Sequence, residues 1–137
     1  MGSVIVFTAA RLDVGRELWY SWGPAGMTTL VADINPGASD SSPWSLAVYG
    51  GLLYFTADDG THGYEPFATD LSAPSILADI NSVDASNPWH YQEYKGKVYF
   101  YADDGIHGTE LWVTDGTGPG TEMVFDLNPN GNGAWPD

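Results

Sequence analysis

The sequence has no cysteine, little positive charge and no long hydrophobic run. Without cysteine no disulfide can stabilise the fold, and no redox compartment can be inferred. Four Lys and Arg residues stand against 18 Asp and Glu residues, so the net charge is −14 at pH 7. This charge opposes binding to phosphate backbones and to anionic membranes. No apolar run approaches the roughly 18 residues of a membrane span. The sequence therefore excludes nucleic acid as a partner and insertion into a membrane.

The segment 97–127, KVYFYADDGIHGTELWVTDGTGPGTEMVFDL, carries the clearest pattern in the chain. Val98, Phe100 and Ala102 alternate with two tyrosines, and a period of two with aromatic and β-branched residues is typical of a strand. The runs 110–114 and 122–127 have the same character, and reversals rich in Asp and Gly separate the three runs. The segment therefore predicts an antiparallel meander.

The same unit occurs three times. A Phe lies near the end of each first strand, a Glu opens each second strand, and an Asp closes each third strand. These landmarks are Phe7, Phe55 and Phe100; Glu17, Glu65 and Glu110; Asp33, Asp79 and Asp126. Their period of roughly 45 to 48 residues is that of four-stranded propeller blades. The sequence thus predicts an all-β fold, a β-propeller-type array of four-stranded antiparallel blades with about three blades per chain.

Residues 4–137 are expected to form a single repeat domain, with repeats at about 4–51, 52–96 and 97–137, after an expression leader at 1–3. A fourth strand follows each long polar loop and pairs through a tight turn, such as Gly50-Gly51, with the first strand of the next copy. The first blade lacks this strand, whereas the tail around Trp135 begins one. Three blades are too few for closure. This favours a homodimer of six blades, in which each tail completes the other chain; a fragment of a longer repeat array is the alternative.

The third copy, ELWVTDGTGPGTEMVFDLNP preceded by VYFYADDGIHG, resembles the bacterial ELWxxDGT repeat family. The second copy keeps Asp59-Gly60 and Glu65 but has Pro66-Phe67 in place of Leu-Trp, and the first keeps Glu17-Leu18-Trp19 but not the Asp-Gly-Thr turn. The resemblance covers the chain from residue 4 to about 135. It implies propeller-like repeats in large secreted or cell-surface bacterial proteins, and no established catalytic function.

Two turns concentrate residues that can bind metal ions. They contain Asp58 and Asp59 in the second copy and Asp103 and Asp104 in the third, each pair followed by a His and a Glu. Carboxylates in a tight loop suit Ca²⁺, for which His is an unusual ligand. Asp and Gly are also the residues that such a turn itself requires. A structural role, a calcium site and a transition-metal site are therefore three alternatives for these aspartates.

Three tryptophans stand beside a proline at a loop-to-strand junction: Trp44 in SPWS, Trp89 in NPWH and Trp135 in AWPD. An indole at a loop edge can stack on the C–H face of a sugar, with polar neighbours that fix its orientation. The polar candidates are Asp40, Asn87, His90 and Asp137. The pattern predicts a repeated carbohydrate site, and tryptophans packed between blades as core are the alternative.

Every candidate carboxylate recurs with its repeat, which is typical of a scaffold. Catalysis instead needs an acid, a base or a nucleophile in its own tuned position. The sequence has no P-loop, nucleophile elbow, HExxH motif or dinucleotide fingerprint. We therefore expect a non-enzymatic, lectin-like binding or adhesion module of a secreted or cell-surface bacterial protein, with a carbohydrate or another surface polymer as partner. A structural self-assembly module and a glycan-active enzyme are the alternatives.

Overall fold

The computed structural model describes residues 3–23, 27–127 and 129, and every regular element within these ranges is a β-strand. No helix in the described part of the chain is long and apolar enough to cross a membrane. The expected all-β class is therefore confirmed.

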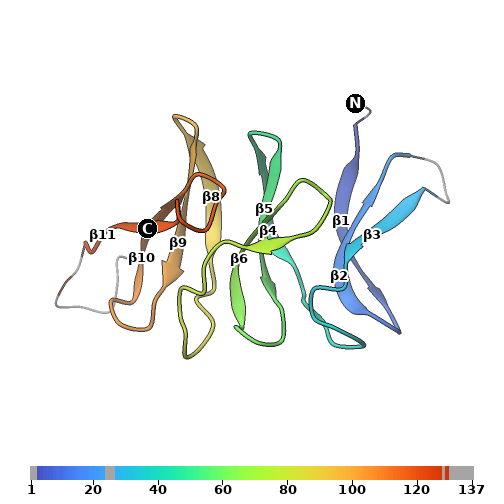
Figure 1. The fold of residues 1–137 in the computed structure, drawn as a ribbon, viewed down its shortest axis with the longest axis horizontal. Coiled ribbons are helices and arrows are strands. Elements are labelled where there is room, and N and C mark those ends of the chain that lie inside the picture. Colours follow the sequence, from blue (N-terminus) through green and yellow to red (C-terminus); the bar gives the residue numbers. More distant parts are fainter. Residues whose placement is uncertain (1–2, 24–26, 128, 130–137) are drawn as a thin grey trace.

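The strands form three antiparallel sheets in chain order (Figure 1). The first sheet contains β1 (Ile5–Arg11), β2 (Gly15–Ser21) and β3 (Thr28–Ala32). The second contains β4 (Trp44–Tyr49), β5 (Leu52–Asp58), β6 (Tyr64–Thr69) and β7 (Ser75–Ile76). The third contains β8 (Trp89–Tyr94), β9 (Lys97–Asp103), β10 (Thr109–Thr114) and β11 (Glu122–Phe125). Each sheet is a meander, and among the described residues the first has one strand fewer than the other two, as the sequence predicts.

The sequence repeats are also structural repeats. In the first and second strands of each copy the same two positions lie opposite each other: Phe7 and Trp19, Phe55 and Phe67, Phe100 and Trp112. A register shift after Leu18 recurs after Leu111, so the third strand of the first and third sheets has the same bulge near its C-terminal end. Equivalent positions in the three sheets can therefore be compared directly.

Two apolar clusters join neighbouring sheets. The cluster between the first and second sheets contains Leu18, Leu53, Phe55, Ala57 and Phe67. The cluster between the second and third sheets contains Tyr54, Ala68, Leu77, Tyr91, Val98, Phe100 and Ala102. Because side chains alternate along a strand, Phe55 faces one neighbouring sheet and Tyr54 faces the other. The second sheet is thus covered on both faces, and this accounts for the nearly continuous burial of β5 and β6.

The second and third sheets approach each other at one edge. Strands β4 and β8 are in contact there, while β7 and β11 form the opposite edges of the two sheets. The three sheets stand side by side along the long axis of the molecule, and they do not close into a ring in the part that the structure describes (Figure 1). Trp135 and the tail expected to complete a blade lie outside the described residues.

Candidate functional site

The tryptophan junctions have the same unusual backbone in both described copies. Trp44 opens β4 and Trp89 opens β8, and the pairing of each strand with its neighbour shifts register directly after the tryptophan. The next residue has a positive φ in each case, 55° at Ser45 and 61° at His90. Non-glycine residues rarely adopt this conformation, and bulges of this kind turn side chains in new directions. The repeat therefore gives the two indoles one common setting.

The two junctions are linked to each other. The backbone N–H of His90 donates a hydrogen bond to the hydroxyl of Ser45 at 3.2 Å. The ring of Trp89 lies 5.0 Å from the ring of Tyr101 in a tilted stack, and the His90 ring lies 6.0 Å from the Trp89 ring. Trp44 is 39% exposed, and Trp89 is half-buried. Each junction thus presents a partly exposed indole, and at the second junction a tyrosine ring and an imidazole lie beside it.

The other predicted carbohydrate contacts have structural partners. The carboxylate of Asp40 accepts a hydrogen bond from the backbone N–H of Arg16 at 2.7 Å, and the side-chain amide of Asn87 donates to the carbonyl of Ala85 at 3.2 Å. Among the polar candidates that the structure describes, His90 is the one whose ring contacts a junction tryptophan, and Asp137 lies outside the described residues. The predicted role of Trp135 falls outside the described residues.

The two Asp-rich turns have identical hydrogen bonding. Asp58 accepts from the N–H of Gly60, and Asp103 accepts from that of Gly105, both at 2.7 Å. The following aspartates, Asp59 and Asp104, each accept two backbone N–H groups through Oδ1 and contact the Nδ1 of a histidine, His62 or His107, through Oδ2 at 2.7 Å. All four predicted metal ligands thus accept hydrogen bonds that close their own turns.

These contacts shift the titration of the Asp–His pairs. Burial acts to raise the pKa of Asp59, but hydrogen bonds from the amide and ring of His62 and the amide of Thr61 outweigh it and lower that pKa. The pKa of Asp104 is lowered in the same way. The hydrogen bond to the carboxylate raises the pKa of His62, and likewise that of His107. Within the described residues no group of three or more His, Cys, Asp or Glu side chains is arranged to hold a metal ion. A calcium site at these turns remains a prediction.

The three repeated glutamates, by contrast, are fully buried. Glu17 accepts hydrogen bonds from the N–H of Ile34 and from the N–H and hydroxyl of Ser41. Glu65 accepts the equivalent bonds from Ile80 and Ser86. Burial raises the pKa of Glu17 and Glu65, and the hydrogen bonds offset only part of this effect. Each carboxylate therefore ties its own sheet to the linker that enters the next sheet.

The serine partners of these glutamates were not foreseen from the sequence. The signal was present, because Ser41 and Ser86 both stand two residues before the proline of a Trp junction. The third glutamate is different: Glu110 accepts a bond from the N–H of Leu127 through Oε2, and its buried Oε1 has no partner among the residues that the structure describes. Within the described residues, Glu110 thus has an acceptor without a donor, which the other two glutamates do not.

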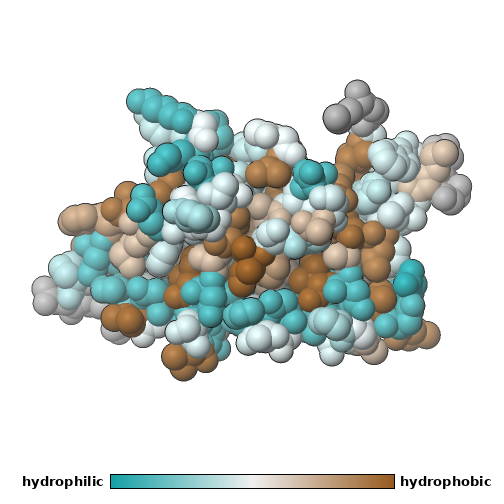
Figure 2. Space-filling model, viewed as in Figure 1, coloured by the Kyte–Doolittle hydropathy of each residue, from teal (hydrophilic) through white to brown (hydrophobic). Residues whose placement is uncertain are grey.

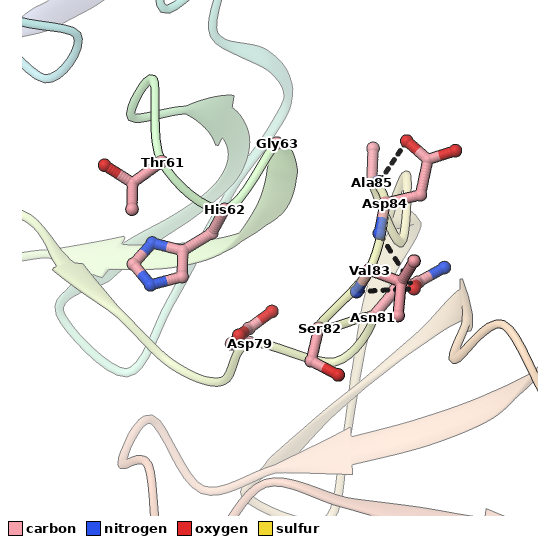
Figure 3. Close-up of a pocket in the computed structure, with 9 residues that line it drawn as sticks. All are labelled: Thr61, His62, Gly63, Asp79, Asn81, Ser82, Val83, Asp84 and Ala85. Atoms are coloured by element: carbon pink, nitrogen blue, oxygen red, sulfur yellow. Dashed lines mark hydrogen bonds between the residues drawn. The ribbon is translucent and has the colours of Figure 1, made fainter.

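A polar hollow lies between the Asp-rich turn of the second sheet and the linker to the third (Figure 3). Thr61 and His62 form one wall, Asp79 lies at the base, and the loop from Asn81 to Ala85 forms the other wall. The side-chain oxygen of Asn81 accepts the N–H groups of Val83 and Asp84, so the loop is internally bonded. The hollow thus contains the imidazole of His62 and the carboxylates of Asp79 and Asp84. It lies between segments that belong to the sequence repeat.

Comparison with known proteins adds no relative to this description. No family model matches the chain, and no curated protein matches its sequence. The function proposed below therefore rests on the residues and their geometry.

Proposed function

We propose that this chain is a non-enzymatic binding or adhesion module, and that its three sheets are blades of a β-propeller-type array that two copies close to six blades. The proposal is supported by the meander topology of the sheets, by the edge contact between β4 and β8, and by the similar apolar clusters between successive sheets. Propellers arrange four-stranded blades around an axis in this manner.

One observation carries the binding function. Trp44 and Trp89 occupy the same bulged junction in adjacent sheets, and a hydrogen bond between Ser45 and His90 holds the two junctions together. The indole of Trp44 is partly exposed, and the Trp89–Tyr101 stack forms an aromatic platform beside His90. Aromatic rings with an adjacent polar group suit the C–H face and hydroxyls of a sugar. A carbohydrate is therefore the ligand class that this surface favours.

The repeated carboxylates support a scaffold role over catalysis. Glu17 and Glu65 accept hydrogen bonds from an adjoining linker, and Asp59 and Asp104 accept bonds within their own turns. Groups engaged in this way hold the backbone in place. The resemblance to the ELWxxDGT repeats supports a secreted or cell-surface location. The membership in that repeat family and the location are both part of the proposal.

Binding to a glycan array tests the carbohydrate function. The full chain should bind a subset of glycans, and Trp44→Ala and Trp89→Ala should each lower the apparent affinity at least about 10-fold, since one aromatic contact of this type contributes on the order of 1–2 kcal/mol. Trp22→Ala is the matched control. Trp22 is exposed and packs edge-on against Tyr20 at the end of β2, away from the junctions.

The far-UV circular dichroism spectrum should be the same for all three variants. A loss of binding can then be attributed to the site and not to unfolding. If no glycan binds the parent chain, or if Trp22→Ala weakens binding as much as the junction variants, the carbohydrate proposal is wrong.

The second candidate function, self-assembly, is favoured by a separate observation on the outer sheet faces.

A further inference from the structure

The outer face of the first sheet resembles a surface that is buried in the other two sheets. Leu53 and Phe55 of β5 face the first sheet and are 5% and 0% exposed. Ile5 and Phe7 stand at the same register positions in β1, on the face directed away from the second sheet. Ile5 is 69% exposed. No sheet covers this face in the described part of the chain, and β1 pairs with a strand on one side only.

The outer face of the third sheet has the complementary character. In the first sheet Leu18 packs beneath the second sheet and is 0% exposed, whereas the equivalent Leu111 is only half-buried. A row of large side chains crosses this face in register, one from each strand: Trp89, Tyr101, Leu111 and Phe125. Phe125 is 65% exposed, and Leu127, just beyond β11, is 58% exposed. The row ends at an open apolar edge.

We infer that a second copy of this chain docks here, with the outer face of its first sheet on the outer face of this third sheet. This contact repeats the relation between the first and second sheets and between the second and third. It joins two different surfaces, so two copies close into a ring through two such contacts, or many copies grow as an open array. The inference rests on the proposed blade arrangement. It also bears on carbohydrate binding, because Trp89 and Tyr101 belong to the docked face; Trp44, which holds the equivalent position where the second and third sheets meet, stays 39% exposed there.

Space-filling representation shows apolar patches at several places along the molecule, separated by polar surface (Figure 2). The net charge of −14 disfavours unspecific association of copies. The four basic residues are divided evenly, with Arg11 and Arg16 in the first sheet and Lys95 and Lys97 at the turn between β8 and β9 of the third. The guanidinium of Arg11 lies 5.2 Å from the centre of the Trp19 ring. Trp19 pairs with Phe7 on the outer face. The Arg11 side chain, which is paired with Asp13, thus lies on the outer face of the first sheet.

Analytical ultracentrifugation of the full chain tests the inference through two face variants. Ile5→Asp alters the first-sheet face, and Phe125→Asp alters the third-sheet face. Both side chains are largely exposed in the single chain, so both variants should fold. Each variant alone should associate at least about 30-fold more weakly than the parent chain, because a charge replaces an apolar contact. An equimolar mixture of the two variants should recover a heterodimer, since one intact pair of faces remains.

Val83→Asp is the control, because Val83 is 94% exposed in the linker between the second and third sheets. It should leave association unchanged. The inference is overturned if the parent chain is monomeric at 100 µM, as it would be if residues 130–137 of the same chain covered the third sheet. It is also overturned if only Phe125→Asp disrupts association, which would indicate third sheet on third sheet, or if the mixture fails to recover. A long open array would support the docking of the two faces but contradict closure to six blades. Glycan binding by a monomeric chain would support the proposed binding function but contradict its closure to six blades by two copies.

Discussion

The hydroxyl of Ser86 donates a hydrogen bond to Oε2 of Glu65, with 2.5 Å between the two oxygens, inside a fully buried site. Ser41 and Glu17 form the same pair one repeat earlier. Each pair fastens the start of a second strand to the segment that enters the next sheet. Successive sheets are thus joined by a buried polar contact as well as by apolar packing.

Replacing Glu65 by Gln should destabilise the protein more than replacing Glu110 by Gln. At Glu65, the amides of Ile80 and Ser86 and the hydroxyl of Ser86 converge on both carboxylate oxygens. A Gln side chain would direct its NH₂ group at one or more of these donors, and each buried unsatisfied group costs about 1–3 kcal/mol. At Glu110 the NH₂ group can take the place of Oε1, which has no described partner, so we expect a loss of about 1 kcal/mol or less.

Urea unfolding of both Gln variants measures this difference. Equal losses would contradict the view that Glu110 has a free acceptor. A Ser86→Ala variant should fall between the two, because it removes one donor and leaves the carboxylate in place.

A second matched pair concerns two glycines with left-handed backbone. Gly15 has φ +68° and Gly50 has φ +59°. A Cβ at Gly15 would lie 2.0 Å from the carbonyl oxygen of Ser39, whereas nothing lies within 4 Å of a Cβ at Gly50. Gly50→Ala should therefore cost only the backbone strain, about 1–2 kcal/mol, and Gly15→Ala should cost a further 1–3 kcal/mol, roughly the overpacking penalty. Thermal unfolding of the two variants should show the larger fall in midpoint for Gly15→Ala, and similar midpoints would refute the close approach.

Much of the fold could be predicted from the sequence because its repeats are read from local signals. Alternating aromatic residues mark β9, Gly50-Gly51 marks the turn between β4 and β5, and the long polar loops mark where one sheet ends and the next begins. These signals gave the grouping of strands into three meanders and the missing strand of the first sheet. Each of these signals involves residues that are close together in the chain, so the strands and turns could be predicted from a single sequence.

The contacts between sheets could not be predicted in the same way. The hydrogen bond from Ser86 to Glu65 joins residues 21 positions apart, and that between His90 and Ser45 joins residues 45 positions apart. Nothing in local spacing indicates such partners. The sequence indicated that the turn aspartates could serve their own turn or a metal ion, and only coordinates show which backbone N–H groups they accept. The pattern of the tryptophans was visible, whereas the bulge that orients them was not.

A third prediction concerns the buried hydroxyl of Tyr91 between the second and third sheets. It lies 3.0 Å from the Thr56 hydroxyl and donates to the carbonyl of Phe55 at 3.2 Å, and burial raises the pKa of Tyr91. Tyr91→Phe removes one partner from each contact, so we expect a loss of about 1–3 kcal/mol in the free energy of unfolding. Tyr49→Phe is the control: the Tyr49 hydroxyl donates one longer bond, 3.4 Å to the carbonyl of Tyr91, and its loss should cost under about 1 kcal/mol. Chemical denaturation of both variants should separate them, and a Tyr91→Phe protein as stable as Tyr49→Phe would contradict the role of this contact.

The Asp–His turns predict that the protein is more stable in mild acid than in weak base. The pKa of His62 and that of His107 are raised in the folded state above the ordinary 6.5. The folded state therefore holds these protons more tightly than the unfolded chain, and the resulting stability is fully present below pH 6.5 and is lost as the pH rises through the folded pKa. The pKa values of Asp59 and Asp104 are lowered from 3.8, so their contribution is present above pH 3.8 and is lost as the pH falls through the lowered value. Both contributions are complete between about pH 4 and pH 6.5.

The urea midpoint of the parent chain should accordingly be higher at pH 5.5 than at pH 8.5. General repulsion within an acidic chain acts in the same direction, so the comparison needs a variant that lacks only the imidazoles. In His62→Asn/His107→Asn the difference between the two pH values should shrink, while His90→Asn, in which the ring lost is edge-on to Trp89 and outside the two turns, should keep it. An unchanged pH dependence in the double variant would show that the imidazoles of the two turns do not contribute to stability, and the raised pKa values would then have to be abandoned as its cause.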